Sequence, residues 1–420
     1  MYRLVNTKRI QLTKYLIFHS LLCFNAFRQI KVGQTQLLSQ MDPDDFEEGP
    51  GWIDPYEDIP CYQPAGLPPE LTYSDAILRA YGDARYALGQ LSTLHDDIEN
   101  ENLLIAPFVV REAAMSSQIE GTDVTVSDIV LHNLDDDPER SAANLRDIRE
   151  AYNYVEAIRT GFNALDDGRQ IDQELLCDLH ASLLVDVRGE NKRPGHIRDD
   201  IPVMIGPDNH IENARFVPAN PNSVALLLDQ LLSYIRNGSY PPLIDIAITH
   251  YQFETIHPFR DGNGRLGRLL IMLQLYQANL LSEPYLYLSA YFNHYRTEYF
   301  DRLLAVSQHG EWESWITFVL NAIAEQAIDA YQCGIELVAL RADYRSRFPN
   351  SPAVRDVIDH LFEEPYLQAP RAIDATGRSR QAVYDAIEKL SDEGIIVELT
   401  DKERNRVYKA PDILALVESP

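Results

Sequence analysis

The sequence predicts a mainly α-helical protein that ends in a smaller domain with a β-hairpin. Helical patterns run from about Pro69 to Asn100 and through the apolar stretch Leu269–Leu273. A third lies at Arg380–Leu390, and two short segments after it alternate around a polar turn, as a hairpin does. With 420 residues, of which 45% are hydrophobic, the chain has enough length and apolar content for two or three domains.

We expect four regions along the chain. Residues 1–40 form a basic leader that is not part of the mature fold, and residues 41–100 form an N-terminal helical region that packs on the main domain. The main domain, residues 101–335, carries the functional motifs. A boundary signal at Arg345–Pro352 precedes a C-terminal domain at residues 350–412.

The leader differs sharply from the rest because residues 1–40 contain six Lys or Arg and no acidic residue. The apolar run Tyr15–Phe24 resembles a secretory signal, but no small-x-small cleavage site follows it. The run is also too short and too polar to span a bilayer. We therefore favour a translation start at Met41 and keep a signal peptide as the alternative.

Charge and cysteine usage exclude several classes of protein. The net charge of -27 argues against general affinity for a nucleic-acid backbone, so any DNA contact must be local. The four cysteines, Cys23, Cys61, Cys177 and Cys333, lack the paired spacing of a zinc site and of a disulfide framework. We therefore expect a reducing, cytoplasmic location.

The densest concentration of chemistry lies in the twelve residues His257–Arg268. Gly262 and Gly264 flank Asn263 just before an apolar stretch, so backbone N–H groups at the start of a helix can face an anion in a tight turn. Such a turn is a phosphate cradle.

Four side chains around this turn suit a nucleotide. Arg265 and Arg268 lie three residues apart on one helical face, where forked guanidinium donors match the oxygens of a polyphosphate. Asp261 is a hard oxygen ligand of the kind that nucleotide-bound Mg²⁺ prefers. His257 can take a proton from an incoming hydroxyl near neutral pH. Each feature alone is more often a turn, a core residue or a solvated helix face, but together they predict transfer of a phosphate-containing group.

The run matches, at every defined position, the signature His-Pro-Phe-x-(Asp/Glu)-Gly-Asn-Gly-Arg-x-x-Arg, and it therefore resembles the Fic-domain proteins. This resemblance implies a helical core with a β-hairpin flap, and transfer of AMP from ATP to a protein hydroxyl with release of pyrophosphate. It also implies that His257 is the base and that Asp261 holds Mg²⁺. The implied phosphate-binding residues are Gly262, Asn263, Gly264, Arg265 and Arg268. The intact glycines favour nucleotidyl transfer over the chemistry of a related kinase branch.

A second motif, Ser116–Gly121, resembles the inhibitory element (Ser/Thr)-x-x-x-Glu-(Gly/Asn) of the same family. Its first residue is Ser116. Pairing between Glu120 and Arg268 would occupy the guanidinium that grips the terminal phosphate, and the carboxylate would repel that phosphate. As a pattern by itself the motif is more often a helix end capped by glycine. Because both motifs lie in one chain, we expect autoinhibition without a separate partner protein.

Between the two motifs, Val203, Met204, Ile205 and Gly206 resemble the family's flap, the hairpin that holds a target segment by strand pairing. A turn and a return strand within residues 206–218 complete the expected hairpin. Met204 stands where the family often has an aromatic residue, and the proline run after the return strand is reduced. These departures concern the choice of target more than the chemistry.

Tyr291, Tyr295 and Tyr299 recur every four residues, so we expect them to share one helix face. They are candidates for the wall of an adenine slot, and an aromatic stripe in the core is an equal alternative. The base of the donor nucleotide is therefore left open.

The C-terminal domain resembles a winged helix-turn-helix. Ser379 caps the helical pattern that ends at Leu390, and two strand patterns flank the polar turn at residues 401–405. In such a domain the second helix of the turn enters a major groove. The candidate DNA contacts are Arg378, Ser379, Arg380, Gln381 and Arg404. Interspersed acidic residues keep a protein-interaction or dimerisation role open.

These observations predict an autoinhibited protein adenylyltransferase that uses Mg²⁺ and ATP to modify a hydroxyl side chain of a target protein or of itself. One alternative is a DNA-binding transcriptional regulator that uses the Fic fold as a nucleotide sensor. Another is removal of AMP by the same site, with Glu120 positioning water. DNA and a second copy of the chain, in a homodimer, are further candidate partners, and no membrane partner is expected.

Overall fold

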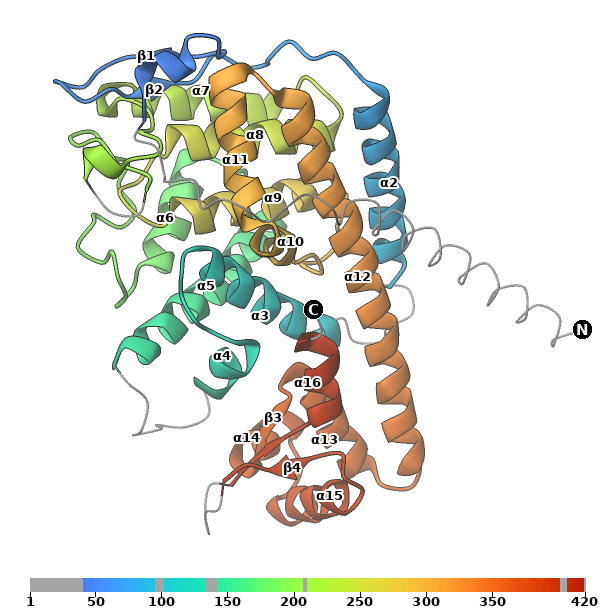
Figure 1. Cartoon of the computed structure of the whole chain (residues 1–420). Helices are drawn as coiled ribbons and strands as arrows, with labels where there is room; N and C mark the ends of the chain where they lie inside the picture. The colour runs from blue at the N-terminus through green and yellow to red at the C-terminus, as the bar shows by residue number, and fades with distance from the viewer. Residues whose placement is uncertain (1–40, 95–101, 133–141, 207–209, 401–405, 419–420) are drawn as a thin grey trace, which may run out of the picture. The chain divides into compact units, whose positions relative to one another are not determined.

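Helices make up most of the computed structural model, which describes residues 41–94, 102–132, 142–206, 210–400 and 406–418 (Figure 1). The predicted mainly α fold is confirmed. The basic leader lies outside the described residues, as do the tip of the expected flap at residues 207–209 and the expected hairpin turn at residues 401–405.

The larger part of the described chain is built from helices, and a long connection between α6 and α7 carries the expected flap. In chain order they are α2 (Asp75–Ser92), α3 (Asn102–Ile119), α4 (Val126–His132), α5 (Ala142–Asp166), α6 (Gln173–Leu183), α7 (Val224–Asn237), α8 (Pro242–Ile256), α9 (Asn263–Gln277), α10 (Leu288–His294), α11 (Arg296–His309) and α12 (Trp312–Arg347), with 3-10 turns η1 (Pro43–Phe46), η3 (Ile211–Asn213) and η4 (Pro221–Ser223). Polar residues cap several of them. The side chain of Ser74 accepts a hydrogen bond from the N–H of Ile77 at the start of α2, and Asp172 does the same for Leu175 in α6.

Helices α8 and α9 form the centre of the core. Almost every residue of both is buried, which is typical of helices that are covered on all sides. Helices α7 and α12 pack on α8, while α3, α5 and α6 pack on α9. The short turn that joins α8 to α9 is therefore fixed at both ends by the core.

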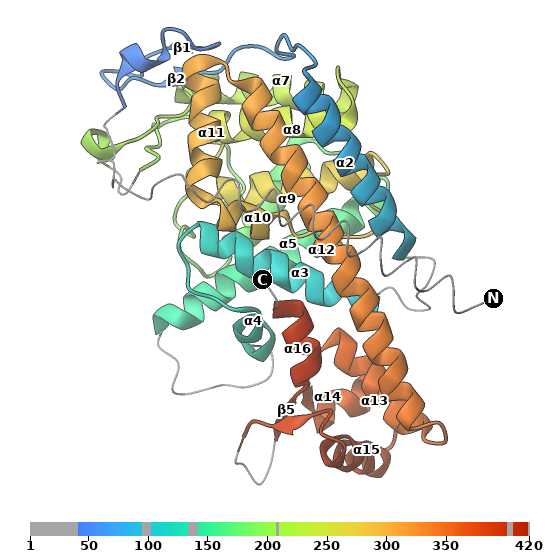
Figure 2. The same cartoon turned by 45° about the vertical axis from the view of Figure 1, so that its right-hand side comes forward.

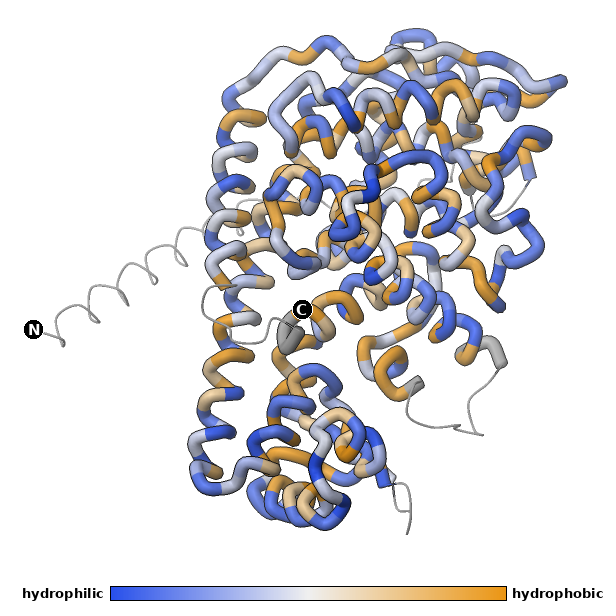
Figure 3. Tube along the Cα trace, turned by 180° about the vertical axis from the view of Figure 1, so that it is seen from behind, coloured by the Kyte–Doolittle hydropathy of each residue, from blue (hydrophilic) through white to orange (hydrophobic). Residues whose placement is uncertain are grey.

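The outer helices are amphipathic. Helix α2 buries one apolar face, including Ile77, Ala84 and Leu91, and packs along α12 (Figure 2). In Figure 3 the outer helices accordingly alternate between hydrophobic and hydrophilic stretches. Among the described residues, no helix is both long enough and apolar enough to cross a membrane.

The N-terminal region differs from the expected helical region at residues 41–100. In its described part, residues 41–94, helix is present only in η1 and α2, while β1 (Trp52–Ile53) and β2 (Tyr62–Gln63) form a short antiparallel pair. The reason is the high frequency of proline between residues 43 and 69, since proline removes a backbone donor and restricts the preceding residue to extended conformations. Further along the chain, the expected end of the main domain at residue 335 falls inside α12, because no proline interrupts this helix.

The C-terminal unit comprises residues 352–418. Its elements are α13 (Pro352–Glu363), β3 (Tyr366–Gln368), α14 (Ala369–Thr376), α15 (Arg380–Asp392), β4 (Val397–Glu398), β5 (Val407–Lys409) and α16 (Pro411–Glu418). The three strands form an antiparallel sheet in the order β3-β5-β4. The side chain of Ser379 accepts from the N–H of Ala382 and caps α15, as the sequence predicts, and Gly377 ends α14 in the left-handed conformation.

This unit contacts the larger part of the chain through α3, α4 and the second half of α12. The Tyr366 hydroxyl donates to Ser127 Oγ of α4 at 2.7 Å, and Ser127 Oγ donates to Glu418 Oε1 at 2.6 Å. Val130 and Leu131 of α4 pack against the small apolar cluster that contains Tyr366. On α12, Tyr344 donates to Asp412 Oδ2 at 2.8 Å.

Replacement of Trp315 tests the packing of α12 on α8. Trp315 is fully buried, and its indole N–H donates to the carbonyl oxygen of Ala247 at 2.8 Å. We expect Trp315→Ala to lower the free energy of unfolding by about 3–5 kcal/mol, because it leaves a cavity and removes the hydrogen bond from the indole. Urea denaturation measures this loss. Trp52→Ala is the matched control, since Trp52 is 57% exposed and its removal should change stability by less than about 0.5 kcal/mol.

Candidate active site

The turn between α8 and α9 has an unusual backbone. His257 ends α8 with φ 52° and ψ 66°, and Gly262 precedes α9 with φ 73°, so both residues are left-handed. This conformation is ordinary for glycine but costly for histidine, and it persists only where the surroundings impose it.

Two side chains hold this turn by bonding to its backbone. The side-chain amide of Asn263 accepts from the N–H of Phe259 and donates to the carbonyl oxygen of Phe259, both at 2.8 Å. His180 accepts from the N–H of Gly195 through Nδ1, so its proton is on Nε2, which donates to the carbonyl oxygen of Asp261 at 2.8 Å. The His180 ring also stacks on Phe259 with centroids 3.8 Å apart. Asn263 therefore contributes only its backbone to the expected phosphate cradle, because its side chain is already engaged.

His257 has the protonation state of a general base. Its Nδ1 lies 3.3 Å from the carbonyl oxygen of Glu254, which can only accept, so the ring proton is on Nδ1 and the Nε2 lone pair is free. Burial, together with the positive charge of Arg198, lowers the pKa of His257 to about 4. The imidazole is therefore neutral near pH 7 and able to accept a proton.

Arg268 is already fully engaged by α3. Its Nε donates to Ser116 Oγ at 2.9 Å, and its Nη2 donates to the carbonyl oxygen of Ser116 at 3.0 Å and to Glu120 Oε1 at 2.7 Å. Burial opposes ionisation of Glu120, but the Arg268 guanidinium outweighs it and lowers the pKa of the carboxyl group. Arg268 is buried, whereas the Glu120 side chain is 39% exposed.

The Glu120 carboxylate lies beside the expected cradle. A Cβ atom added to Gly264 would lie 2.3 Å from Glu120 Oε1, so the carboxylate lies directly against the first turn of α9. Among the described residues, no side chain caps the N-terminus of α9. The carboxylate is therefore close to the positive end of the helix dipole, while the N–H groups of the first turn keep their capacity to bind an anion.

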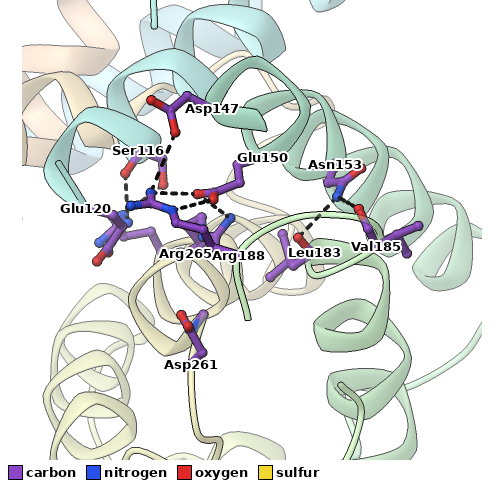
Figure 4. A network of polar contacts seen from close by, with 12 residues as sticks. Ser116, Glu120, Asp147, Glu150, Asn153, Leu183, Val185, Arg188, Asp261 and Arg265 are labelled. Atoms are coloured by element: carbon purple, nitrogen blue, oxygen red, sulfur yellow. Dashed lines mark hydrogen bonds and ion pairs between the residues drawn. The ribbon is translucent and has the colours of Figure 1, made fainter. Parts of the chain in front are cut away.

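Arg265 has N–H donors that are not hydrogen-bonded within the described part of the chain. It is buried, and its nearest described carboxylate oxygen, Glu150 Oε2, is 3.7 Å from Nη1, beyond hydrogen-bond distance (Figure 4). Arg188 takes both oxygens of Glu150, at 2.8 and 3.1 Å. Among the described residues, Nε and Nη1 of Arg265 are left without a hydrogen-bond acceptor. Buried unpaired donors are rare, and these indicate a place for an oxygen-rich anion.

The only acidic side chain of the turn is Asp261, and it fits a metal that arrives with a nucleotide. Its Oδ1 accepts from the N–H of Gly262 at 2.7 Å, and burial raises its pKa despite the nearby Arg265. The part of the chain that the structure describes contains no cluster of three or more metal ligands. One carboxylate suits Mg²⁺, which completes its shell with phosphate oxygens and water.

Comparison with known proteins identifies this arrangement. Residues 78–163 match the Fic/DOC family N-terminal region, and residues 170–275 match the Fic/DOC family. The chain is a Fic-domain protein. Its Fic domain is similar over 172 residues, at 26% identity, to a probable protein adenylyltransferase of Aquifex aeolicus, covering 41% of this chain and 49% of that protein. A protein adenylyltransferase of Caenorhabditis elegans is 39% identical over 62 residues, which are 14% of this chain and 12% of that protein. The chain thus spans half or less of the length of these relatives.

A solved structure shows the same fold. A Fic family protein from Desulfovibrio desulfuricans superimposes with a TM-score of 0.53 at 21% identity, covering 82% of this chain and 98% of that protein. The shared region is larger than the Fic domain matches alone, which end at residue 275. This likeness concerns the arrangement of the chain, because identity at this level does not extend to activity.

The flap of this Fic domain has less strand than expected. Ile205 and Phe216 form one antiparallel bridge, in which the N–H of Ile205 donates to the carbonyl oxygen of Phe216 at 2.9 Å. Val203 and Met204 lie before this bridge and Gly206 lies after it, and none of the three belongs to a β-strand. The N-terminal region covers the return side of the flap, since the N–H of Tyr62 donates to the carbonyl oxygen of Val217 at 2.9 Å.

The three tyrosines considered for an adenine slot keep their spacing across the junction of α10 and α11. The N–H of Tyr295 donates to the carbonyl oxygen of Tyr291 at 3.0 Å, and the N–H of Tyr299 donates to that of Tyr295 at 2.8 Å. The rings of Tyr291 and Tyr295 lie 4.6 Å apart, while the buried Tyr299 shares a hydrogen bond with His250 Nε2 at 2.8 Å. The burial of Tyr291 and Tyr299 agrees with an aromatic core, and Tyr291 also lines a pocket.

The candidate DNA contacts are engaged by neighbours of their own unit. Arg378 pairs with Asp356 at 2.5 Å, Gln381 donates to Asp385 at 2.7 Å, and the Arg380 guanidinium lies 5.5 Å from the Tyr384 ring centroid. Ser379 serves as the cap of α15. Arg404 lies outside the described residues.

Glu254 is a half-buried acid beside the Fic site, one of whose carboxylate oxygens is fully buried, and it provides a test of this environment. Burial and the nearby Glu120, opposed by Arg268, raise its pKa from 4.5 to about 8. The folded state keeps a proton that the unfolded state loses, so this contribution to stability is complete below pH 4.5 and is lost as pH rises through about 8. Between these two pH values, the free energy of unfolding of the wild type should fall, relative to that of Glu254→Gln, by up to about 1.4 kcal/mol per pH unit.

Urea denaturation of both proteins between pH 5 and 8 measures this difference. The exposed residue Glu70 provides the control variant Glu70→Gln, for which the difference from wild type should not vary with pH in this way. A constant difference for Glu254→Gln would show that Glu254 is ionised in the folded protein.

Proposed function

We propose that this Fic-domain protein is an autoinhibited protein adenylyltransferase, which transfers AMP from ATP to a hydroxyl side chain of a target protein or of itself. The observation that carries this proposal is the Glu120 carboxylate, which lies against the first turn of α9 and binds Arg268 while Arg265 keeps unpaired donors. Such a site is suited to a triphosphate whose last phosphate is excluded. The names of the curated relatives, protein adenylyltransferases, support the same reaction class.

In the proposed reaction, His257 Nε2 takes the proton of the target hydroxyl. The hydroxyl oxygen then forms a bond to the α-phosphorus of ATP, the bond from this phosphorus to the bridging oxygen of the β-phosphate breaks, and pyrophosphate leaves. Arg265 and the first turn of α9 stabilise the developing negative charge. Mg²⁺ would be held by Asp261 and would neutralise phosphate charge when bound.

Autoinhibition follows from competition for Arg268. A terminal phosphate requires the same guanidinium that Glu120 and Ser116 now occupy, and it would also meet the negative charge of Glu120. ATP would then bind with its α-phosphorus out of line with the incoming hydroxyl, because small misplacements slow such transfers strongly. Ser116 contributes by keeping Arg268 directed toward α3.

The target of the transfer is a protein segment that pairs with the flap. Support comes from the bridge between Ile205 and Phe216, since an extended peptide can add to the edge of a hairpin through main-chain hydrogen bonds. We propose a winged helix-turn-helix for the C-terminal unit, with DNA or protein as its ligand. The three described cysteines are free, which agrees with the proposed cytoplasmic location.

Removal of AMP from a modified protein is a second candidate activity. The exposure of the Glu120 side chain favours it, because a carboxylate reached by solvent can orient a water molecule toward the phosphorus of a bound AMP group. The same residue would then inhibit transfer and support hydrolysis.

Radiolabel transfer tests the main proposal. The full chain, Glu120→Gly, and Glu120→Gly combined with His257→Ala are incubated with Mg²⁺ and ATP labelled at the α-phosphate. We expect label on the protein only in the single variant, because it lacks the competing carboxylate and keeps the base. The loss of the base should lower the rate by about 100-fold or more.

A blank in all three proteins would contradict the proposal. A shift of duplex DNA by the same blank proteins would then favour the transcriptional regulator. Loss of label from a premodified wild-type chain, faster than from Glu120→Gly, would instead support AMP removal.

A further inference from the structure

One arginine close to the base finds, among the described residues, only backbone oxygens as hydrogen-bond acceptors. Arg198 is 1% exposed, and its Nε donates to the carbonyl oxygen of His257 at 2.7 Å. Its Nη2 donates to the carbonyl oxygens of Ile256 at 2.9 Å and Ala219 at 2.6 Å. Within the described part of the chain, no carboxylate forms an ion pair with it. A buried guanidinium without a counter-ion is costly, so its presence needs a reason.

The carbonyl groups that Arg198 binds belong to three functional segments. Ile256 and His257 form the C-terminal end of α8, where a cation is favourable beside the negative end of the helix dipole. Ala219 follows the return side of the flap, and Arg198 itself precedes the flap. The backbone N–H of Arg198 also donates to the carbonyl oxygen of Pro258 at 2.9 Å. Arg198 therefore joins both ends of the flap to the backbone of the base.

We propose that Arg198 positions the base of the proposed transfer reaction by holding the His257 backbone in its left-handed conformation between the two ends of the flap. This inference rests on the proposed function. It predicts that the flap, which would hold the target hydroxyl, and the imidazole, which would deprotonate it, keep a fixed separation. A residue with this role affects the chemical step more than the binding of ATP.

Electrostatics supports the same role. The charged groups that face His257 are Arg198, which precedes the flap, and Glu120, which directly follows α3. After burial, Arg198 is the larger of these influences and lowers the pKa of the imidazole, whereas Glu120 raises it. A residue that only stabilised the fold would not shift the titration of His257 when replaced by a neutral side chain.

The test uses the full chain with Glu120→Gly, alone and combined with Arg198→Lys, Arg198→Met or Arg302→Met. Arg302 is the matched control, because it binds the carbonyl oxygen of Ser314 at 3.0 Å and lies away from the site. We expect both Arg198 variants to lower kcat by about tenfold or more while KM for ATP stays within about twofold. The His257 titration midpoint, followed by NMR, should rise by about one pH unit in Arg198→Met and stay in place in Arg198→Lys.

An unchanged His257 midpoint in Arg198→Met, or a loss in KM alone, would overturn the assignment. If Arg198→Met does not fold, the assignment is tested by Arg198→Lys, whose kcat should still fall as stated. If Glu120→Gly has no transfer activity at all, the proposed function fails, and the NMR titration still tests Arg198 by itself.

A separate set of contacts concerns the position of Glu120. Helices α3 and α4, residues 102–132, form a hairpin whose connection begins just after Glu120. This connection is tight: Gln118 Nε2 donates to the carbonyl oxygen of Val124 at 2.8 Å, and Arg296 Nε donates to that of Ile119 at 2.9 Å. The far side of the hairpin is held by the C-terminal unit through Ser127, which binds Tyr366 and Glu418.

We further infer that the C-terminal unit regulates the proposed activity by holding this hairpin, and with it Glu120, against α9. A ligand that drew the C-terminal unit away from α4 would loosen the hairpin and favour release of Arg268. The coupling is a competition between two positions of one helix pair, and couplings of this kind typically change activity by about 5- to 150-fold.

Ser127→Asp tests this coupling, because it places a charge beside Glu418. We expect self-modification to rise by about fivefold or more in the chain that keeps Glu120, and to stay within about twofold in the Glu120→Gly chain, where nothing is left to release. Ser92→Asp, at the exposed end of α2, is the control. No rise, or an equal rise in both chains, would overturn the inference. If neither chain transfers AMP, faster hydrogen exchange at residues 116–125 in Ser127→Asp decides instead.

Discussion

The turn between α8 and α9 is held by side chains that bond to its backbone, and the geometry of the whole site depends on this restraint. Asn263 closes a ring with both polar groups of Phe259, His180 binds the carbonyl oxygen of Asp261, and Arg198 binds that of His257. Left-handed backbone at a histidine costs energy that these bonds offset. The buried helices on either side supply a rigid frame. Fixed backbone in turn places the imidazole, the carboxylate and the first N–H groups of α9 around one small space.

The two arginines of α9 differ in their hydrogen-bond partners because different helices lie beside them. Arg268 meets α3 and finds three acceptors, while Arg265 meets α5, where Arg188 has already taken the available carboxylate. One guanidinium is therefore satisfied and the other is not, although the two are a single turn apart and equally buried. In the proposed function, such a site would retain affinity for a nucleotide while the productive arrangement of its last phosphate would be prevented.

The sequence predicts the parts of this site that are contiguous or that carry a known pattern. The run His257–Arg268 indicates the turn and its chemistry, and the resemblance to Fic proteins brings Glu120 to Arg268 across 148 residues. The sequence does not predict the roles of Arg198 and His180, because both residues bind backbone groups, and every residue type carries the same backbone groups. The N-terminal region is a different case, because the prolines between residues 43 and 69 that replace helix by extended backbone are themselves visible in the sequence.

The pair of hydrogen bonds between the Asn263 side chain and the Phe259 backbone has a chemical consequence for the lifetime of the protein. An asparagine followed by glycine is open to deamidation, because the next backbone nitrogen can attack the side-chain carbonyl to form a succinimide, and glycine offers little hindrance. In the folded chain the amide is buried and held at both ends, away from this attack. Unfolded molecules lack that protection. An aspartate formed there could not donate to Phe259, so a chain that has aged while unfolded would refold without a bond that its active turn requires.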